Sequence, residues 1–138
     1  MPIIFQSTII RRDLHLNRRS LYLFGDNEER KGLGGQAGEM RGEPNAHGIR
    51  TKKSPGYDRH DFWDDEDFDR VSLLIKEDFE KPYRWVSNSQ TVVIPSAHFG
   101  TGRADLKERA PRIFKFIERK IELLVELGES VAKANRKI

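Results

Sequence analysis

The chain has 138 residues, 36% hydrophobic and 34% charged, so residues 1–138 are expected to form a single domain with one core. Its 25 basic and 22 acidic side chains leave a formal charge of only +3, which excludes a chain-wide nucleic-acid surface. The absence of cysteine excludes disulfides, thiolate metal sites and cysteine nucleophiles.

The first half of the chain predicts short strands separated by loops. Residues 3–10 and 20–25 are rich in branched and aromatic side chains, so both are predicted as strands, with a basic turn between them. After a glycine loop, residues 36–42 can form only a short helix because Gly42 and Pro44 stop it. Residues 47–52 predict another short strand, followed by a polar, turn-forming segment.

The second half predicts two helices around one strand. Apolar residues at helical spacing predict a helix from Glu66 to Lys81, which Pro82 ends, with aspartates around its first turn. Residues 91–97 read as the clearest strand. A long amphipathic helix is predicted from Leu106 to about Leu127, closed by Gly128, with 128–138 as a frayed tail. This order of elements predicts a layered α/β domain.

Two glycine-bearing loops, GLGGQAG at 32–38 and FGTG at 99–102, each stand between a strand and a helix. In open α/β sheets, ligands bind beyond the carboxyl ends of strands, where loop amides can approach an anion. The first loop is neither a Walker loop nor a complete dinucleotide fingerprint. Two readings stay open: the glycines serve chain geometry alone, or the two loops together form a phosphate-binding cradle.

These motifs resemble those of macrodomains. The segment GDNEERKGLGGQAGEM, residues 25–40, is similar to their first ligand loop, and VVIPSAHFGTGRADLKERAPRIFKFI, residues 92–117, is similar to their second. The segment NAHGIRTKKSP, residues 45–55, resembles the branch that contains the terminal ADP-ribose protein glycohydrolases and the DarTG antitoxin macrodomain. The whole pattern also resembles small macrodomain-like proteins of bacteria and phages.

The resemblance implies a compact three-layer α/β/α sandwich with a mixed central sheet, in which the polar tail supplies no closing strand. It implies binding of ADP-ribose or an ADP-ribosyl group between the two loops, without a cofactor. The expected partners are therefore ADP-ribose, or an ADP-ribosylated protein or nucleic acid. Two functions stay open: hydrolysis of the ADP-ribosyl link, or a non-catalytic binding module for an ADP-ribose-like or NAD-derived nucleotide.

Lys52 and Asp105 match the catalytic pair of the lysine-using branch, in which a lysine attacks the anomeric carbon and an acid assists. Lys53 is the alternative lysine. In the structural reading of the same residues, the two lysines are solvated and Asp105 caps the helix that follows.

The resemblance also implies ligand contacts from both loops and the adjoining strand ends. Asn27 matches the ribose-contacting asparagine and Asp26 a group that contacts the adenine amino group, although these roles can be exchanged. The first loop is expected to meet the distal ribose or the phosphates, and the second loop the diphosphate. The complete expected set is Asp26, Asn27, Gly34, Gly35, Gln36, Ala37, Thr51, Pro95, His98, Gly100, Thr101, Gly102 and Arg103.

The remaining expectations concern metals, membranes and location. His60 stands among several aspartates, but their spacing matches no EF-hand, and capping of the following helix explains them without a metal. No apolar run approaches the roughly 20 residues that span a bilayer. A cytoplasmic protein with no membrane partner is therefore expected, while the oligomeric state is not predicted.

Overall fold

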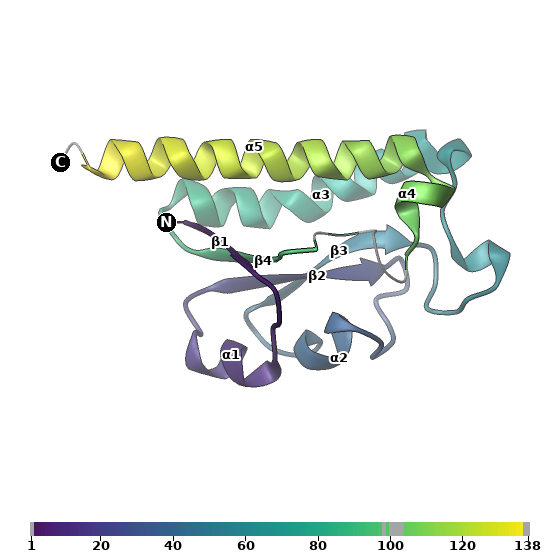
Figure 1. The fold of residues 1–138 in the computed structure, drawn as a ribbon, viewed down its shortest axis with the longest axis horizontal. Helices are drawn as coiled ribbons and strands as arrows, with labels where there is room; N and C mark the ends of the chain where they lie inside the picture. The colour runs from purple at the N-terminus through teal and green to yellow at the C-terminus, as the bar shows by residue number, and fades with distance from the viewer. Residues whose placement is uncertain (1, 98, 100–103, 137–138) are drawn as a thin grey trace.

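Four strands and their connecting helices form three layers in this computed structural model, which describes residues 2–97, 99 and 104–136 (Figure 1). The helices α3 and α5 cover one face of the sheet, and α1 and α2 cover the other. The strands are β1 (Ile3–Gln6), β2 (Leu21–Asn27), β3 (Ala46–Lys52) and β4 (Val92–Pro95). The helices are α1 (Arg11–Leu16), α2 (Gln36–Met40), α3 (Phe68–Ser87), α4 (Leu106–Arg109) and α5 (Pro111–Arg136), with 3₁₀ turns at Arg59–Asp61 and Asp65–Asp67.

The sheet has the order β1-β4-β2-β3, and every neighbouring pair of strands is parallel. The expectation of an α/β fold is confirmed, but the expected mixed sheet is wrong. The physical reason is the connections: each consecutive pair of strands is joined through a helix, so the chain returns to the same end of the sheet each time. Among the described residues, no strand follows β4.

Both faces of the central strands are buried, as expected for a parallel sheet with helices on each side. Leu21 and Leu23 of β2 face the core under α3 and α5, whereas Tyr22 and Phe24 face the core over α1 and α2. Because successive side chains of a strand point to opposite faces, the continuous apolar run of β2 supplies both cores.

α3 continues through Pro82 to Ser87, so the predicted end at Lys81 is wrong. Proline has no N–H group, which leaves the carbonyl of residue i−4, here Asp78, without its usual helical donor. His47 Nε2 lies 2.6 Å from this Asp78 oxygen and donates to it. The imidazole of β3 thus compensates for the missing bond and allows the helix to continue.

The last helical region also differs from its prediction. It is divided into α4 and α5, and α5 begins at Pro111, because proline suits the first turn of a helix. α5 then runs through Gly128 to Arg136, so the predicted end near Leu127 and the frayed tail are wrong for the described residues. A Cβ at Gly128 would lie 2.9 Å from Ile3 Cγ1, so this glycine lets α5 pack closely on β1.

α1 forms where a basic turn was predicted. The Asp13 carboxylate accepts a hydrogen bond from the Ile10 amide at 3.0 Å, and Leu14 is completely buried. Three side chains around α1, those of Arg11, His15 and Arg18, converge on Glu43 at 2.6 to 3.0 Å. Long-range ion pairs therefore hold the helix against the loop that follows α2.

This cluster predicts a pH dependence of stability. Hydrogen bonds from Arg18 and Arg11 lower the pKa of Glu43 from 4.5 to about 2. Because the folded-state pKa lies below the unfolded-state value, the stabilisation is complete above pH 4.5 and is lost as the pH falls toward 2. Urea unfolding across this range should show a shallower pH dependence for Glu43→Gln than for the wild type. Glu80→Gln, on an exposed position of α3, should leave the slope unchanged.

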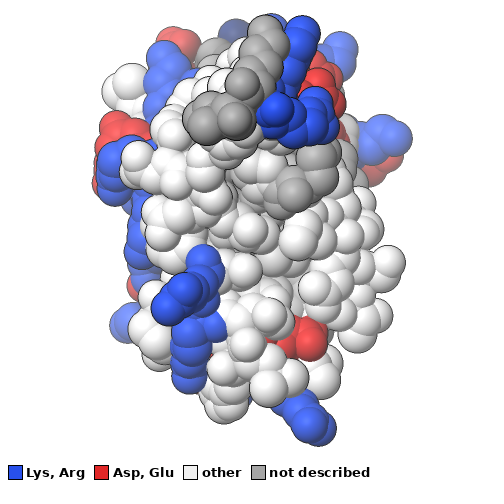
Figure 2. Space-filling model, turned by 90° about the vertical axis from the view of Figure 1, so that its left-hand side faces the viewer, with Lys and Arg blue, Asp and Glu red and all other residues white. Residues whose placement is uncertain are grey.

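At the end of the molecule where the parallel strands begin, charged side chains lie mostly around the rim of the face and the middle is largely uncharged (Figure 2). None of the helices within 2–97 and 104–136 is long and apolar enough to cross a bilayer. A cavity lined in part by polar groups lies at the opposite end, beyond the carboxyl ends of the strands.

Candidate functional site

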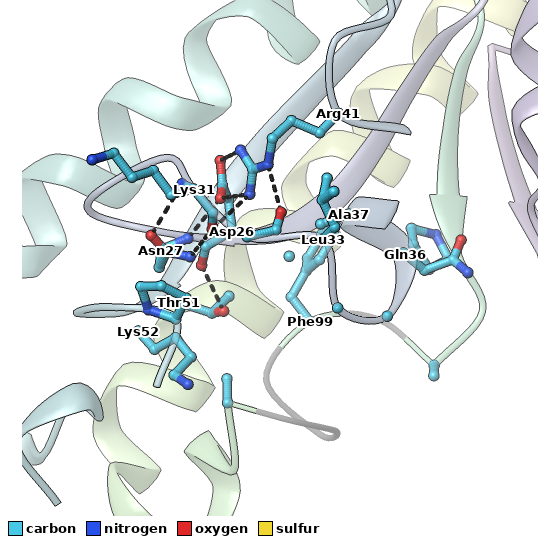
Figure 3. Close-up of a pocket in the computed structure, with 18 of the residues that line it drawn as sticks. Asp26, Asn27, Lys31, Leu33, Gln36, Ala37, Arg41, Thr51, Lys52 and Phe99 are labelled. Carbon is cyan, nitrogen blue, oxygen red and sulfur yellow. Dashed lines mark hydrogen bonds and ion pairs between the residues drawn. The ribbon is translucent and has the colours of Figure 1, made fainter. Parts of the chain in front are cut away.

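A cavity of about 460 Å³ lies at the carboxyl ends of β2 and β4 (Figure 3). These two strands are neighbours, but β2 leads to α2 on one face of the sheet and β4 leads toward α5 on the other. A crevice opens where adjacent strands send their connections to opposite faces, which is where α/β sheets commonly bind ligands. The described lining comprises Ser7, Gly25, Asp26, Asn27, Lys31, Gly32, Leu33, Gly34, Gly35, Gln36, Ala37, Arg41, Thr51, Lys52, Pro55, Tyr57, Pro95, Ala97, Phe99 and Ala104.

The glycine loop is held in place by two side chains. Asn27 donates to the Lys31 carbonyl at 2.7 Å and accepts from the Glu29 amide at 3.0 Å. Arg41, which follows α2, donates to the carbonyls of Gly32 at 2.8 Å and Lys31 at 3.2 Å. The loop therefore has a defined shape before any ligand arrives.

Glycine is required at two positions of this loop for distinct reasons. Gly35, which precedes α2, has φ of +59° and ψ of −140°, a conformation that residues with a Cβ rarely adopt. Gly38 lies under the loop, and a Cβ there would be 2.5 Å from the Leu33 carbonyl oxygen. The absence of a side chain at Gly38 lets the loop fold back onto α2.

Asp26 is buried and paired on both carboxylate oxygens. Arg41 Nη2 lies 2.6 Å from Oδ1, and Arg30 Nη1 lies 3.1 Å from Oδ2. Figure 3 shows the Arg41 guanidinium directed at this carboxylate. Two arginines of the protein therefore already bind the Asp26 carboxylate, and this pairing helps to orient the loop. This geometry does not favour the expected contact of Asp26 with a ligand amino group.

Lys52 and Thr51 end β3 at the cavity wall, and both are buried. The Thr51 hydroxyl donates to the Asp26 carbonyl at 3.1 Å. Lys52 Nζ donates to the Gly56 carbonyl at 2.5 Å and lies 4.8 Å and 4.4 Å from the ring centres of Tyr57 and Phe62. A carbonyl and two aromatic faces all stabilise the ammonium form of this lysine.

Asp105 does not belong to the described lining. It stands immediately before α4 with φ of +48°, and its carboxylate pairs with Arg109 Nε at 3.2 Å. The Arg109 guanidinium lies 3.8 Å from the centre of the Phe62 ring, which also contacts Lys52. Arg109 and Phe62 thus link Asp105 to Lys52.

The cavity collects the residues expected from the first loop, the end of β3 and the end of β4. Lys53, the alternative lysine, is exposed and does not line the cavity. The expected residues that line it are Asp26, Asn27, Gly34, Gly35, Gln36, Ala37, Thr51, Lys52 and Pro95. His98, Gly100, Thr101, Gly102 and Arg103 lie outside the described residues.

The sequence interpretation missed several residues of the cavity wall. Ser7 follows β1, Lys31 directly precedes the glycine loop, Leu33 lies within it, and Tyr57 lies in the segment after β3. Lys31 could have been predicted from the sequence, because it directly precedes the first glycine of the loop. No local pattern placed Ser7 here, because its position depends on the pairing of β1 with β4.

One cluster of potential metal ligands, Asp58, His60 and Asp61, has donor atoms within 4.8 Å of one another. Asp61 is already engaged: it accepts from the Ser54 hydroxyl and from the Asp58 amide. The Ser54 hydrogen bond also lowers the pKa of Asp61. Hydrogen bonding within the loop therefore accounts for this carboxylate without an ion.

Comparison with known proteins gives a match to a protein family. No curated protein matches the chain, and no solved structure matches it. The sequence model of a family of unknown function (DUF7831) matches residues 4–120, which contain the whole sheet except Ile3 of β1, and every described residue of the cavity wall. The chain therefore belongs to this family of unknown function, DUF7831.

Proposed function

We propose that this protein binds ADP-ribose or an ADP-ribosyl group in the cavity between β2 and β4. The observation that carries the proposal is the pinned glycine loop, which forms one wall of a nucleotide-sized cavity at the carboxyl ends of two parallel strands. Glycines without side chains allow backbone amides to approach a diphosphate closely. The macrodomain-like motifs of the sequence favour the same ligand.

The proposed ligand lies along the cavity with its distal ribose near Asn27 and Lys52. Its diphosphate then passes along Gly34 and Gly35, and its adenine reaches the wall formed by Gln36 and the end of β4. Lys52 and Gln36 lie well apart across the view of Figure 3, which suits an elongated ligand. Asp26 supports the loop in this arrangement and makes no ligand contact.

Calorimetric titration with ADP-ribose tests this proposal, with ribose 5-phosphate as the smaller comparison ligand. Gly25→Val supplies a blocked cavity, because Gly25 lies in its wall and a Cβ there meets only ordinary contacts, 3.7 Å from Thr51 Oγ1. We expect binding by the wild type and at least about a tenfold loss in this variant, whose thermal unfolding reports whether the fold is kept. Equal binding by both proteins would place the ligand elsewhere, and no binding by the wild type would reject the proposal.

Hydrolysis of an ADP-ribosyl link is the second candidate, and the position of Lys52 in the cavity wall favours it over a role at the surface. Against it, the expected acid Asp105 does not belong to the described lining and pairs with Arg109, and Lys52 already contacts the Gly56 carbonyl and the rings of Tyr57 and Phe62. Binding without turnover is therefore the leading proposal.

Lys52→Ala and Lys53→Ala form a matched pair that separates the two functions. If the protein is a hydrolase, release of ADP-ribose from modified protein or DNA should fall at least about 100-fold in Lys52→Ala and persist in Lys53→Ala. A wild-type protein that binds ADP-ribose but releases none from either substrate would exclude hydrolysis and leave the binding function intact.

A further inference from the structure

Three exposed apolar and aromatic side chains, those of Leu33, Pro55 and Tyr57, line the cavity and form what we call the apolar rim. Leu33 of the glycine loop is 72% exposed, and Tyr57, in the segment after β3, is 62% exposed. Single exposed apolar residues are common on protein surfaces. Three of them on the wall of one cavity indicate a surface that a bound molecule covers.

The two segments that carry the apolar rim contact each other and are each held by hydrogen bonds. Gly32 lies against Pro55, so a Cβ on this glycine would be 3.2 Å from Pro55 Cβ. The segment after β3 is held by Asp61, which accepts from the Ser54 hydroxyl. The rim is therefore formed before a ligand arrives, which lowers the entropic cost of binding there.

The apolar rim lies at the end of the cavity where the distal ribose of the ligand is proposed to bind. The centre of the Tyr57 ring is 4.8 Å from Nζ of Lys52, the residue proposed to lie near that ribose. A ring attached to C1 of the distal ribose therefore reaches Tyr57. Aromatic side chains bind planar rings by stacking, whichever base the ring belongs to.

We propose that the apolar rim binds a second planar ring on the distal ribose, so that the preferred ligand is a free dinucleotide joined through a diphosphate. This inference rests on the proposed binding of an ADP-ribosyl group and adds the class of ligand. A base within a modified nucleic acid would supply the same ring, but the chain that follows Tyr57 disfavours it. Residues 58–67 contain six acidic side chains, one arginine and no lysine, so they repel a phosphate backbone.

Diadenosine diphosphate is the probe, because it is ADP-ribose with a second adenine in place of the hydroxyl group on C1 of the distal ribose. Its two identical ends favour its binding by about twofold on statistical grounds alone. Stacking of the second adenine adds to this, so we expect the wild type to bind diadenosine diphosphate at least about tenfold more tightly than ADP-ribose in calorimetric titrations.

Variants of Tyr57 test whether the ring causes this ratio of affinities. Tyr57→Ala should reduce the ratio to about two, whereas Tyr57→Phe, which keeps the ring, should preserve it. Tyr83→Ala is the matched control, because Tyr83 is 40% exposed on α3 and does not belong to the described lining. The ratio cancels any loss of affinity that the two ligands share, so it reports on the second ring.

The outcomes separate this inference from the function on which it rests. If the wild type binds both ligands with a ratio of about two or less, the apolar rim does not bind a ring, and ADP-ribose binding stays established. A large ratio that persists in Tyr57→Ala would also overturn the inference. Tighter binding of a single-stranded oligonucleotide with ADP-ribose on a base would overturn the choice of a free dinucleotide. Binding of none of these ligands by the wild type would reject both proposals. The wild-type comparison decides the question even if Tyr57→Ala fails to fold.

Discussion

Asp78→Ala is expected to lower the free energy of unfolding by about 3 kcal/mol, because it removes the buried carboxylate that both Arg50 and Arg30 bind. Asp78 is 2% exposed and accepts from Arg50 Nε at 3.0 Å, Arg50 Nη2 at 2.9 Å and Arg30 Nη2 at 2.7 Å. Breaking a buried pair typically costs about 3–5 kcal/mol, and the partial exposure of Arg30 favours the lower end. Urea unfolding followed by circular dichroism measures the change.

Glu77→Ala is the matched control, because it removes a carboxylate from the adjacent residue of α3. Glu77 is 68% exposed and lies 3.7 Å from Arg50, so its pair is weakened by solvent. We expect a change below about 1 kcal/mol. If the two variants lose similar amounts of unfolding free energy, the burial of Asp78 does not strengthen its ion pairs, and the expectation is wrong.

The Asp78 network extends from the helical layer to the cavity. Arg30 bridges Asp78 at 2.7 Å and Asp26 at 3.1 Å, and it also donates to the Gly48 carbonyl at 2.8 Å. Asp26 in turn holds Arg41, which holds the glycine loop. The packing of α3 against β3 and the shape of the cavity wall therefore depend on the same chain of charged groups.

The elements that follow from local pattern were predictable from the sequence. β2 and β4 are short apolar runs rich in branched or aromatic residues, and the glycines of the first loop mark the turn into α2. α1 was missed because its stability comes from Glu43, far along the chain. Pro82 was misread as a helix end because its compensating partner, His47, lies in another element.

The sequence could predict which residues lie at the site, but not which residues they form ion pairs with. Asp26 was expected to face the ligand because it ends a strand beside the glycine loop. Its pairing with Arg41 depends on how the intervening loop folds back, which no spacing rule specifies. Arg50 was likewise an available cation in the sequence, whereas the structure pairs it with Asp78 of α3. In both cases the charged side chain forms an ion pair with a residue from another part of the fold.

Arg41→Ala is expected to weaken ADP-ribose binding about tenfold and to lower the free energy of unfolding by about 2 kcal/mol. The stability falls because Asp26, which is buried, then keeps only Arg30 as an ionic partner within the described part of the chain. Affinity falls because the Gly32 carbonyl loses the Arg41 donor and the Lys31 carbonyl keeps only that of Asn27 among the described residues, so the ligand must order the loop that Arg41 now holds. Calorimetry measures the loss of affinity and urea unfolding measures the loss of stability. The loss of stability does not depend on the identity of the ligand.

Arg70→Ala is the matched control, because Arg70 also pairs with a carboxylate near this loop, that of Glu28 at 2.7 Å. This pair is more exposed than the pair of Arg41 and Asp26, and it makes no contact with the loop carbonyls that Arg41 binds. We therefore expect the free energy of unfolding to fall by less than about 1 kcal/mol and the affinity for ADP-ribose to stay unchanged. Arg41→Lys sharpens the comparison, since lysine keeps the charge but cannot bind Asp26 and the two carbonyls with one planar group. If Arg41→Lys binds ADP-ribose like the wild type, charge alone maintains the loop; weak binding in both Arg41 variants would establish that the guanidinium geometry prepares the site.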